Sequence, residues 1–169
     1  RDGLILGICN GFQALIKSGL LPYGEIRTLD ETSPTLTRNH INRHISSVVR
    51  TRVASTCSPW LQGLECGEVY SIPVSHGEGR LVADEAMIEQ LFANGQVAFQ
   101  YCDETGTPTM DPTANLNGSD WAIEGLVSPD GKVLGKMGHS ERYTNGLYLN
   151  VDGDKDQKMF AGAVSYFRD

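Results

Sequence analysis

The chain has 169 residues, of which 40% are hydrophobic, and a formal net charge of −7 at pH 7 from 14 basic and 21 acidic side chains. This length predicts one domain that buries roughly 70% of the surface of its unfolded chain. An acidic chain is a poor match for a nucleic acid or an anionic membrane, so we expect neither as a partner. The sequence has no run of 18 apolar residues, and we expect no transmembrane helix.

The N-terminal part of the chain predicts a strand, a sharp turn and a helix. Residues 4–8 form an apolar run typical of a buried strand, and residues 12–16 have the periodicity of a helix that ends at Gly19. The intervening residues 7–11 read Gly-Ile-Cys-Asn-Gly, and we expect both glycines to remove Cβ atoms that would clash in the turn. This is the arrangement of a nucleophile elbow, with the thiol of Cys9 in place of a hydroxyl.

The elbow predicts a reactive cysteine. The Cys9 sulfur is expected at a helix N-terminus, where unpaired N–H groups and the helix dipole favour an anion and lower the pKa of a thiol. The backbone N–H of Asn10 is placed to donate to an oxyanion. The alternative is a structural cysteine buried beside turn glycines.

Beyond the elbow the sequence predicts several strands and two further helices. A β-rich stretch begins at Thr35, and a short helix or turn begins at a capping residue, Ser58. We expect strands over residues 46–53, 68–74, 96–101, 122–127 and 132–137, helices over residues 83–94 and 157–167, loops over residues 75–80 and 103–120, and a hairpin turn over residues 128–131. This order predicts an α/β fold with an open mixed, mostly parallel sheet and flanking helices.

The cysteines and the start of the chain carry two further expectations. The four cysteines, Cys9, Cys57, Cys66 and Cys102, form no Cys-x-x-Cys pair, so we expect reduced thiols in a cytoplasmic protein. A Cys57–Cys66 disulfide is the alternative. The chain reaches its first predicted strand within three residues, and we therefore expect a fragment of a larger protein.

A thiol nucleophile needs a base, and the base needs an orienting group. His139 follows the strand predicted over residues 132–137, a place where catalytic loops of open α/β sheets gather. Glu141 lies two residues later and would project to the same side in extended backbone. Its carboxylate would hold the imidazole tautomer while the other ring nitrogen faces Cys9. The alternative is an exposed polar loop.

The chain has three other histidines, His40, His44 and His76. His76 is the second candidate base, and its neighbours Gly77, Glu78 and Gly79 either supply N–H groups that cradle a substrate carboxylate or form a simple turn. His40 and His44 have the spacing of two zinc ligands on a helix, but their surroundings favour β-structure and the sequence offers no obvious third ligand. We therefore expect no metal site.

The motifs together resemble a known family. Residues 7–13, with His139 and Glu141, resemble the Cys-His-Glu triad of class I glutamine amidotransferases, which implies a flavodoxin-like sheet. Four more segments resemble, in order and spacing, the glutaminase domain of phosphoribosylformylglycinamidine synthases: Arg38-Asn39, residues 75–80, Asn115 to Ser119, and His139 to Arg142. The resemblance runs from residue 3 to about residue 143, and residues 136–142 and 154–158 look more like the C-terminal part of the long single-chain forms than the small separate subunit.

The resemblance implies a mechanism. Cys9 attacks the side-chain amide of glutamine, His139 protonates the departing ammonia, and Glu141 orients His139. Water then hydrolyses the thioester, and the ammonia passes to a synthetase domain or subunit that uses ATP and Mg²⁺ to make the amidine of formylglycinamide ribonucleotide in purine biosynthesis. No cofactor is expected in the chain itself. The resemblance also places four residues near the glutamine: Gln13, His76, Gly77 and Glu78.

The chain departs from the family pattern in two ways. Gly138 and Ser140 stand where the family most often has prolines, which predicts a looser loop around His139. The family's domain also begins upstream, with a βα unit and a glycine-rich loop that supplies another oxyanion N–H. We therefore expect residues 1–169 to be one glutaminase domain that lacks its first βα unit. Two alternatives remain: a non-catalytic interaction or structural fragment of the same enzyme, and another cysteine hydrolase of the same fold.

Overall fold

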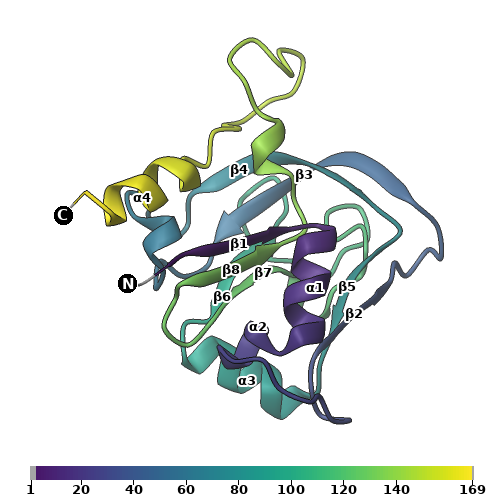
Figure 1. Ribbon diagram of the computed structural model, residues 1–169. Coiled ribbons are helices and arrows are strands. Elements are labelled where there is room, and N and C mark those ends of the chain that lie inside the picture. The colour runs from purple at the N-terminus through teal and green to yellow at the C-terminus, as the bar shows by residue number, and fades with distance from the viewer. Residues whose placement is uncertain (1–2, 169) are drawn as a thin grey trace.

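A computed structural model describes residues 3–168, so Arg1, Asp2 and Asp169 lie outside the described residues (Figure 1). The described residues form a six-stranded sheet, a two-stranded sheet and four α-helices. The strands are β1 (Ile5–Ile8), β2 (Thr35–Arg38), β3 (Ile45–Val53), β4 (Val69–His76), β5 (Glu78–Val82), β6 (Val97–Tyr101), β7 (Ile123–Val127) and β8 (Val133–Lys136). The helices are α1 (Asn10–Ser18), α2 (Leu20–Tyr23), α3 (Glu85–Ala93) and α4 (Met159–Tyr166), with 3₁₀ turns η1 (Pro59–Leu61), η2 (Asp120–Ala122) and η3 (Ser140–Arg142).

The large sheet has the strand order β1-β8-β7-β6-β3-β4. It is mixed, as predicted, but the expectation of a mostly parallel sheet is wrong for residues 3–168. The β1–β8 pair is parallel, whereas the other four neighbouring pairs in this sheet are antiparallel. For β7 and β8 the reason is the short connection between them, because a parallel pair needs a crossover of a dozen or more residues. The predicted turn at residues 128–131 instead joins β7 and β8 as a hairpin.

The sheet curls, so that its two edge strands approach each other at one end. β1 and β4 are the outermost strands in the order above, and Figure 1 shows β3 and β4 arching over the others. The backbone N–H of His139, just after β8, donates to the carbonyl of Pro73 in β4 at 2.8 Å. This curl brings the ends of β1, β8 and β4 together.

Residues 75–80 were expected to form a loop, and this expectation is wrong. They form the end of β4 and most of β5, which turn at Gly77 and belong to different sheets. β5 pairs antiparallel with β2, and its Leu81 is fully buried. Glycine and charged residues favour a loop locally, but pairing and burial override that preference because β-propensity depends on context.

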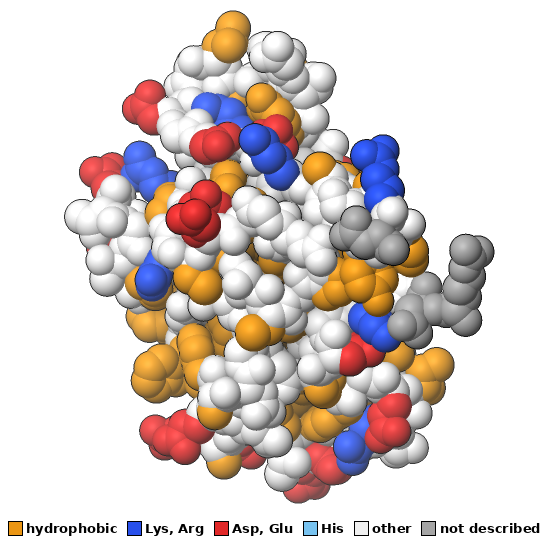
Figure 2. All heavy atoms as spheres, turned by 90° about the vertical axis from the view of Figure 1, so that its left-hand side faces the viewer, with side chains coloured by type: hydrophobic (Ala, Val, Ile, Leu, Met, Phe, Trp, Pro, Cys, Tyr) orange, Lys and Arg blue, Asp and Glu red, His pale blue; other side chains and the backbone are white. Residues whose placement is uncertain are grey.

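Helices cover both faces of the large sheet. One apolar cluster joins Phe12, Leu15 and Ile16 of α1 to strands β6, β7 and β8, and a second cluster contains Met159 and Ala163 of α4. Phe160 and Val164 of α4, and Phe167 directly after it, are about half exposed. Figure 2, which views the molecule from the side of α4, shows apolar side chains scattered among charged ones on this face.

Local signals in the sequence define the helix ends. α1 ends at Gly19, whose φ of 84° is left-handed. Asp84 caps α3, accepting a hydrogen bond from the backbone N–H of Met87 at 2.7 Å, and Ser58 caps η1 in the same way.

All four cysteines are free, as predicted. Within residues 3–168, no helix is both long enough and apolar enough to cross a membrane.

Candidate active site

Cys9 lies in a strained turn between β1 and α1. Its backbone has φ 53° and ψ −107°, a region that costs a residue with a Cβ about 1–3 kcal/mol. Its N–H donates to the carbonyl of Lys136 at 2.8 Å, which ties the turn to the end of β8. Its carbonyl accepts from the N–H of Gln13 at 3.2 Å, the first bond of α1. The structure therefore has the predicted strand–turn–helix elbow, with the cysteine at its bend.

The two glycines of the elbow have different roles. A Cβ at Gly7 would lie 2.5 Å from Cδ1 of Leu15 and 2.7 Å from the backbone of Gly11, so only glycine lets β1 and α1 pack this closely. A Cβ at Gly11 would meet no atom of residues 3–168 within 4 Å, apart from its own helix and chain neighbours. The expectation that both glycines avoid a clash is therefore correct for Gly7 and wrong for Gly11.

The thiol of Cys9 is half-buried, and this decides its charge. Burial raises the pKa of the Cys9 thiol above its ordinary value, although the backbone N–H of Asn10 and the charge of Arg142 act to lower it. The helix N-terminus therefore does not lower the thiol pKa as expected, because desolvation outweighs it. The thiol donates a long hydrogen bond, 3.7 Å, to the carbonyl of Ser75. A neutral thiol of this kind needs a base before it can attack.

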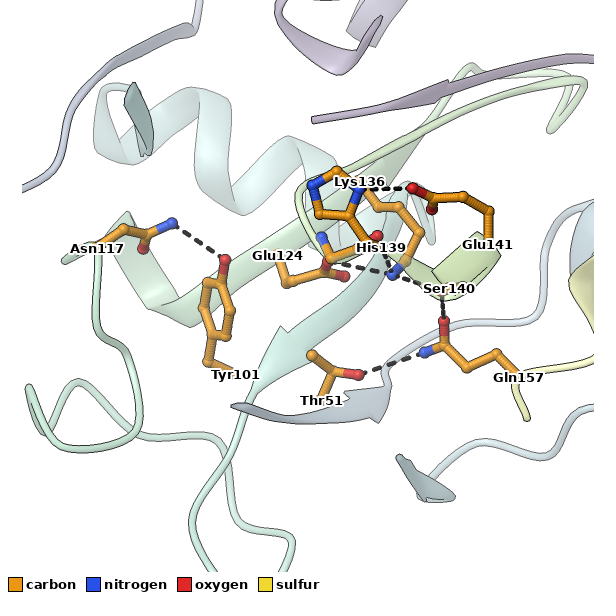
Figure 3. A network of polar contacts seen from close by, with 10 residues as sticks. Thr51, Tyr101, Asn117, Glu124, Lys136, His139, Ser140, Glu141 and Gln157 are labelled. Atoms are coloured by element: carbon orange, nitrogen blue, oxygen red, sulfur yellow. Dashed lines mark hydrogen bonds and ion pairs between the residues drawn. The ribbon is translucent and has the colours of Figure 1, made fainter. Parts of the chain in front are cut away.

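His139 carries the features of such a base. Its Nδ1 lies 2.6 Å from Oε1 of Glu141, whereas its Nε2 is buried and has no hydrogen-bond partner within residues 3–168 (Figure 3). A carboxylate at Nδ1 selects the tautomer with the proton on that nitrogen, which leaves Nε2 as an acceptor. Glu141 reaches the ring from the 3₁₀ turn η3 and not from the extended backbone that the sequence suggested.

The fold brings Cys9 and His139 to the same end of the sheet. In the parallel β1–β8 pair Ile8 lies opposite Lys136, so the chain leaves both strands in the same direction. Cys9 follows β1 directly, and His139 follows β8 by three residues. Both also contact the end of β4, and the charge of Glu141 acts on the Cys9 thiol. Ligand sites of open α/β sheets lie at such carboxyl ends.

The residues expected near glutamine lie beside this end. The side-chain amide of Gln13 donates to the carbonyl of Glu78, and Gly77 links β4 to β5. His76 is buried, and its Nδ1 lies 3.0 Å from Oδ1 of Asn39. Burial lowers the pKa of His76 to about 4, and the nearby His44 and His139 add to this effect. Its Nε2, like that of His139, has no partner within the described residues.

His40 and His44 are exposed and make separate contacts. Nε2 of His44 lies 3.1 Å from Oγ of Ser75, and the ring of His40 packs at Gly118. Neither lies in a helix: His40 is in a turn, and His44 is in irregular backbone just before β3. Among residues 3–168, no cluster of three or more His, Cys, Asp or Glu side chains has a geometry that could hold a metal ion.

The sequence reasoning missed a buried ion pair beside His139. Nζ of Lys136 lies 3.3 Å from Oε1 of Glu124, and neither side chain has any exposed surface. Lys136 also donates to the carbonyl of Gly138 and to Oγ of Ser140, each at 3.0 Å (Figure 3). One lysine and one glutamate inside two otherwise apolar strands were the available signal, because such residues are almost never fully buried unless paired.

A cavity of about 730 Å³ lies away from these residues. It is lined by parts of α3 and η2, with Phe92, Met110 and Trp121 among its walls, and it contains neither Cys9 nor His139. The candidate active site is therefore identified by the side chains of Cys9, His139 and Glu141, and not by this cavity.

Comparison with known proteins gives a consistent set of relatives. The sequence model of the family described as CobB/CobQ-like glutamine amidotransferase domain matches residues 1–167. Proteins named phosphoribosylformylglycinamidine synthase subunit PurQ are 37% identical over 166 residues in Bradyrhizobium diazoefficiens and 40% identical over 165 residues in Gloeobacter violaceus. Each alignment covers 98% of this chain and 64% of the relative, so the chain spans less than two thirds of their length.

A solved structure agrees with these sequences. A chain in the structure described as PurLQS from Thermotoga maritima superimposes with a TM-score of 0.69 and 29% identity, over 97% of this chain and 62% of that one. The relatives are named as separate subunits. The likeness to the C-terminal part of a long single-chain form is therefore not borne out.

Proposed function

The chain belongs to the CobB/CobQ-like glutamine amidotransferase domain family, and from this premise we propose that it is the glutaminase part of a phosphoribosylformylglycinamidine synthase. Its substrate is glutamine. The ammonia released serves a synthetase partner, which uses ATP and Mg²⁺ to convert formylglycinamide ribonucleotide to formylglycinamidine ribonucleotide in purine biosynthesis. The names of the relatives support this assignment. The chain itself uses no cofactor, and its four free cysteines fit a cytoplasmic enzyme.

The observation that carries the proposal is the buried Nε2 of His139, which has no hydrogen-bond partner in the described part of the chain, while Glu141 holds the other ring nitrogen. In the proposed mechanism Nε2 takes the proton of the Cys9 thiol, and the sulfur forms a bond to the amide carbon of glutamine. The carbonyl oxygen becomes an oxyanion, to which the N–H of Asn10 donates. Glu141 stabilises the imidazolium that forms.

The second half of the reaction releases the products. The imidazolium gives its proton to the amide nitrogen as the carbon–nitrogen bond breaks, and ammonia leaves. His139 then takes a proton from water, whose oxygen attacks the thioester, and the proton returns to the sulfur as glutamate leaves. Because burial raises the pKa of the Cys9 thiol, the initial transfer of its proton to His139 is required for attack near neutral pH. Gln13, His76, Gly77 and Glu78 are proposed to contact the glutamine.

The test compares two nitrogen sources in the full-length protein assembled with its synthetase partner. We expect Cys9→Ala to reduce glutamine-dependent synthesis to background and to leave ammonia-dependent synthesis at the wild-type rate, because only the first needs the thiol. Cys57→Ala, which changes an exposed cysteine outside the site, is the matched control and should retain both activities.

Two outcomes would reject the proposal. Equal loss of both activities in Cys9→Ala would show that the residue maintains the structure and is not the nucleophile. Full glutamine-dependent activity in that variant would favour a non-catalytic role for this part of the protein.

A further inference from the structure

The buried ion pair of Lys136 and Glu124 lies directly beneath the loop that carries His139. Lys136 is the last residue of β8, and Glu124 lies on the neighbouring strand β7. Removing both charges from water is costly, and a pair of this kind is often no more stabilising than apolar residues of the same volume. Its presence therefore calls for a reason other than stability, and its contacts supply one.

Every donor of the lysine is used. A lysine ammonium group has three N–H bonds, and Nζ of Lys136 reaches Glu124, the carbonyl of Gly138 and the hydroxyl of Ser140. Gly138 also donates its backbone N–H to Oε1 of Glu124 at 2.5 Å. The residues on both sides of His139 are thus bonded to the ion pair, by hydrogen bonds that a charge strengthens.

The network continues into the C-terminal segment. The hydroxyl of Ser140 donates to Oε1 of Gln157, and the amide of Gln157 lies 3.3 Å from Oγ1 of Thr51 (Figure 3). Gln157 is buried, although it follows a long irregular stretch after η3. Ser140 is therefore held from two directions, by β8 and by the segment that precedes α4.

The backbone of the loop is seated on the ion pair without spare room. A Cβ at Gly138 would lie 2.9 Å from Oε1 of Glu124, 3.0 Å from Nζ of Lys136 and 2.7 Å from Cγ2 of Ile72. The ion pair thus fixes the position of the backbone at Gly138, the residue before His139. A shift of either charged group would move the loop with it, because interiors are close-packed.

We propose that Lys136 and Glu124 are positioning residues for His139, holding the loop so that the imidazole stays at the end of the sheet where Cys9 lies. The inference rests on the proposed glutaminase function and extends it to residues that touch neither substrate nor sulfur. Hydrogen bonds from Gly138 and Ser140 set the geometry of this loop, and proline could supply neither of them. These contacts replace the restraint that prolines at these two positions would have supplied.

The experiment replaces the ion pair by apolar residues in the full-length protein with its synthetase partner. Lys136→Met alone would leave Glu124 buried and unpaired, so the variant to use is Lys136→Met with Glu124→Leu, which keeps a packed core. We expect kcat for glutamine-dependent synthesis to fall about 10–100-fold, since a misplacement near 1 Å has effects of this order. We expect KM for glutamine to change less than about twofold, and ammonia-dependent synthesis and the urea midpoint to stay at wild-type values.

Controls separate this inference from the function on which it rests. Ser140→Ala removes the hydroxyl that bonds Lys136 and Gln157 but leaves the Lys136–Glu124 pair in place, so it should give a smaller fall in kcat. Lys17→Met changes an exposed lysine of α1 and should change nothing. A double variant that is folded and retains wild-type kcat would overturn the positioning role. If Cys9→Ala in the same preparation keeps glutamine-dependent synthesis, the glutaminase proposal itself fails. A fall in ammonia-dependent synthesis equal to the fall with glutamine would show a merely structural pair.

Discussion

Within residues 3–168, two buried histidines have a nitrogen without a hydrogen-bond partner, but their other nitrogens meet different groups. Nδ1 of His139 faces the carboxylate of Glu141, whereas Nδ1 of His76 faces the amide oxygen of Asn39. A carboxylate stabilises an imidazolium, but a neutral amide does so only weakly. Burial keeps His76 neutral near pH 7, and the carboxylate of Glu141 makes His139 the better of the two candidate bases.

The neutral His76 predicts a specific dependence of stability on pH. Its pKa in the folded protein is lowered to about 4 from an ordinary value of 6.5, so the unfolded chain binds a proton in this range and the folded chain does not. The free energy of unfolding therefore falls as the pH drops through this window, by up to roughly 3 kcal/mol from this group. We expect His76→Gln to lose this part of the decline.

Urea unfolding of the full-length protein, at pH values from about 7 to about 4, measures the effect. His40→Gln, at an exposed histidine, is the control and should follow the wild-type curve. If His76→Gln also follows that curve, His76 is not held neutral by burial.

At the scale of single elements, the β1–α1 elbow depends on close packing at one glycine and not at the other. Gly7→Ala would place its Cβ on Leu15 and on the helix backbone, so we expect destabilisation of about 1–3 kcal/mol. Gly11→Ala places a Cβ in open space within a helix, so we expect no loss, and a gain of up to about 1 kcal/mol.

The urea midpoints of these two variants form a matched pair, since both change a glycine of the same turn. Glutamine-dependent activity should fall in Gly7→Ala, because α1 carries Asn10 and Gln13. Equal midpoints for the two variants would contradict the packing that the structure shows at Gly7.

Local patterns predicted most elements, and their failures share one cause. The strand and helix of the elbow, the cap at Asp84 and the hairpin at residues 128–131 all depend on neighbours in sequence, and each was predicted. Residues 75–80 read locally as a loop because their partners lie far away in sequence: residues 78–80 pair with β2, some 40 positions earlier. The parallel or antiparallel sense of the sheet likewise depends on pairings that no local window contains.

At the scale of the whole molecule, the curl of the sheet assembles the candidate site from distant segments. The ends of β1, β4 and β8 meet there, and they contribute Cys9, His76 and His139. The sequence pointed to the cysteine and the His-x-Glu pair because each forms a short motif. It did not reveal the Lys136–Glu124 pair, because contact between β7 and β8 side chains depends on register and on which face of the sheet is buried.

Covalent labelling shows whether Cys9 is the nucleophile toward glutamine. The full-length protein with its synthetase partner is incubated with 6-diazo-5-oxo-norleucine, a glutamine analogue that alkylates a reactive thiol, and its peptides are examined by mass spectrometry. Cys57 and Cys66 are exposed and serve as internal controls for unselective reaction. We expect one adduct, on Cys9, and we expect excess glutamine to prevent it. An unmodified Cys9, or labelling confined to the exposed cysteines, would contradict it.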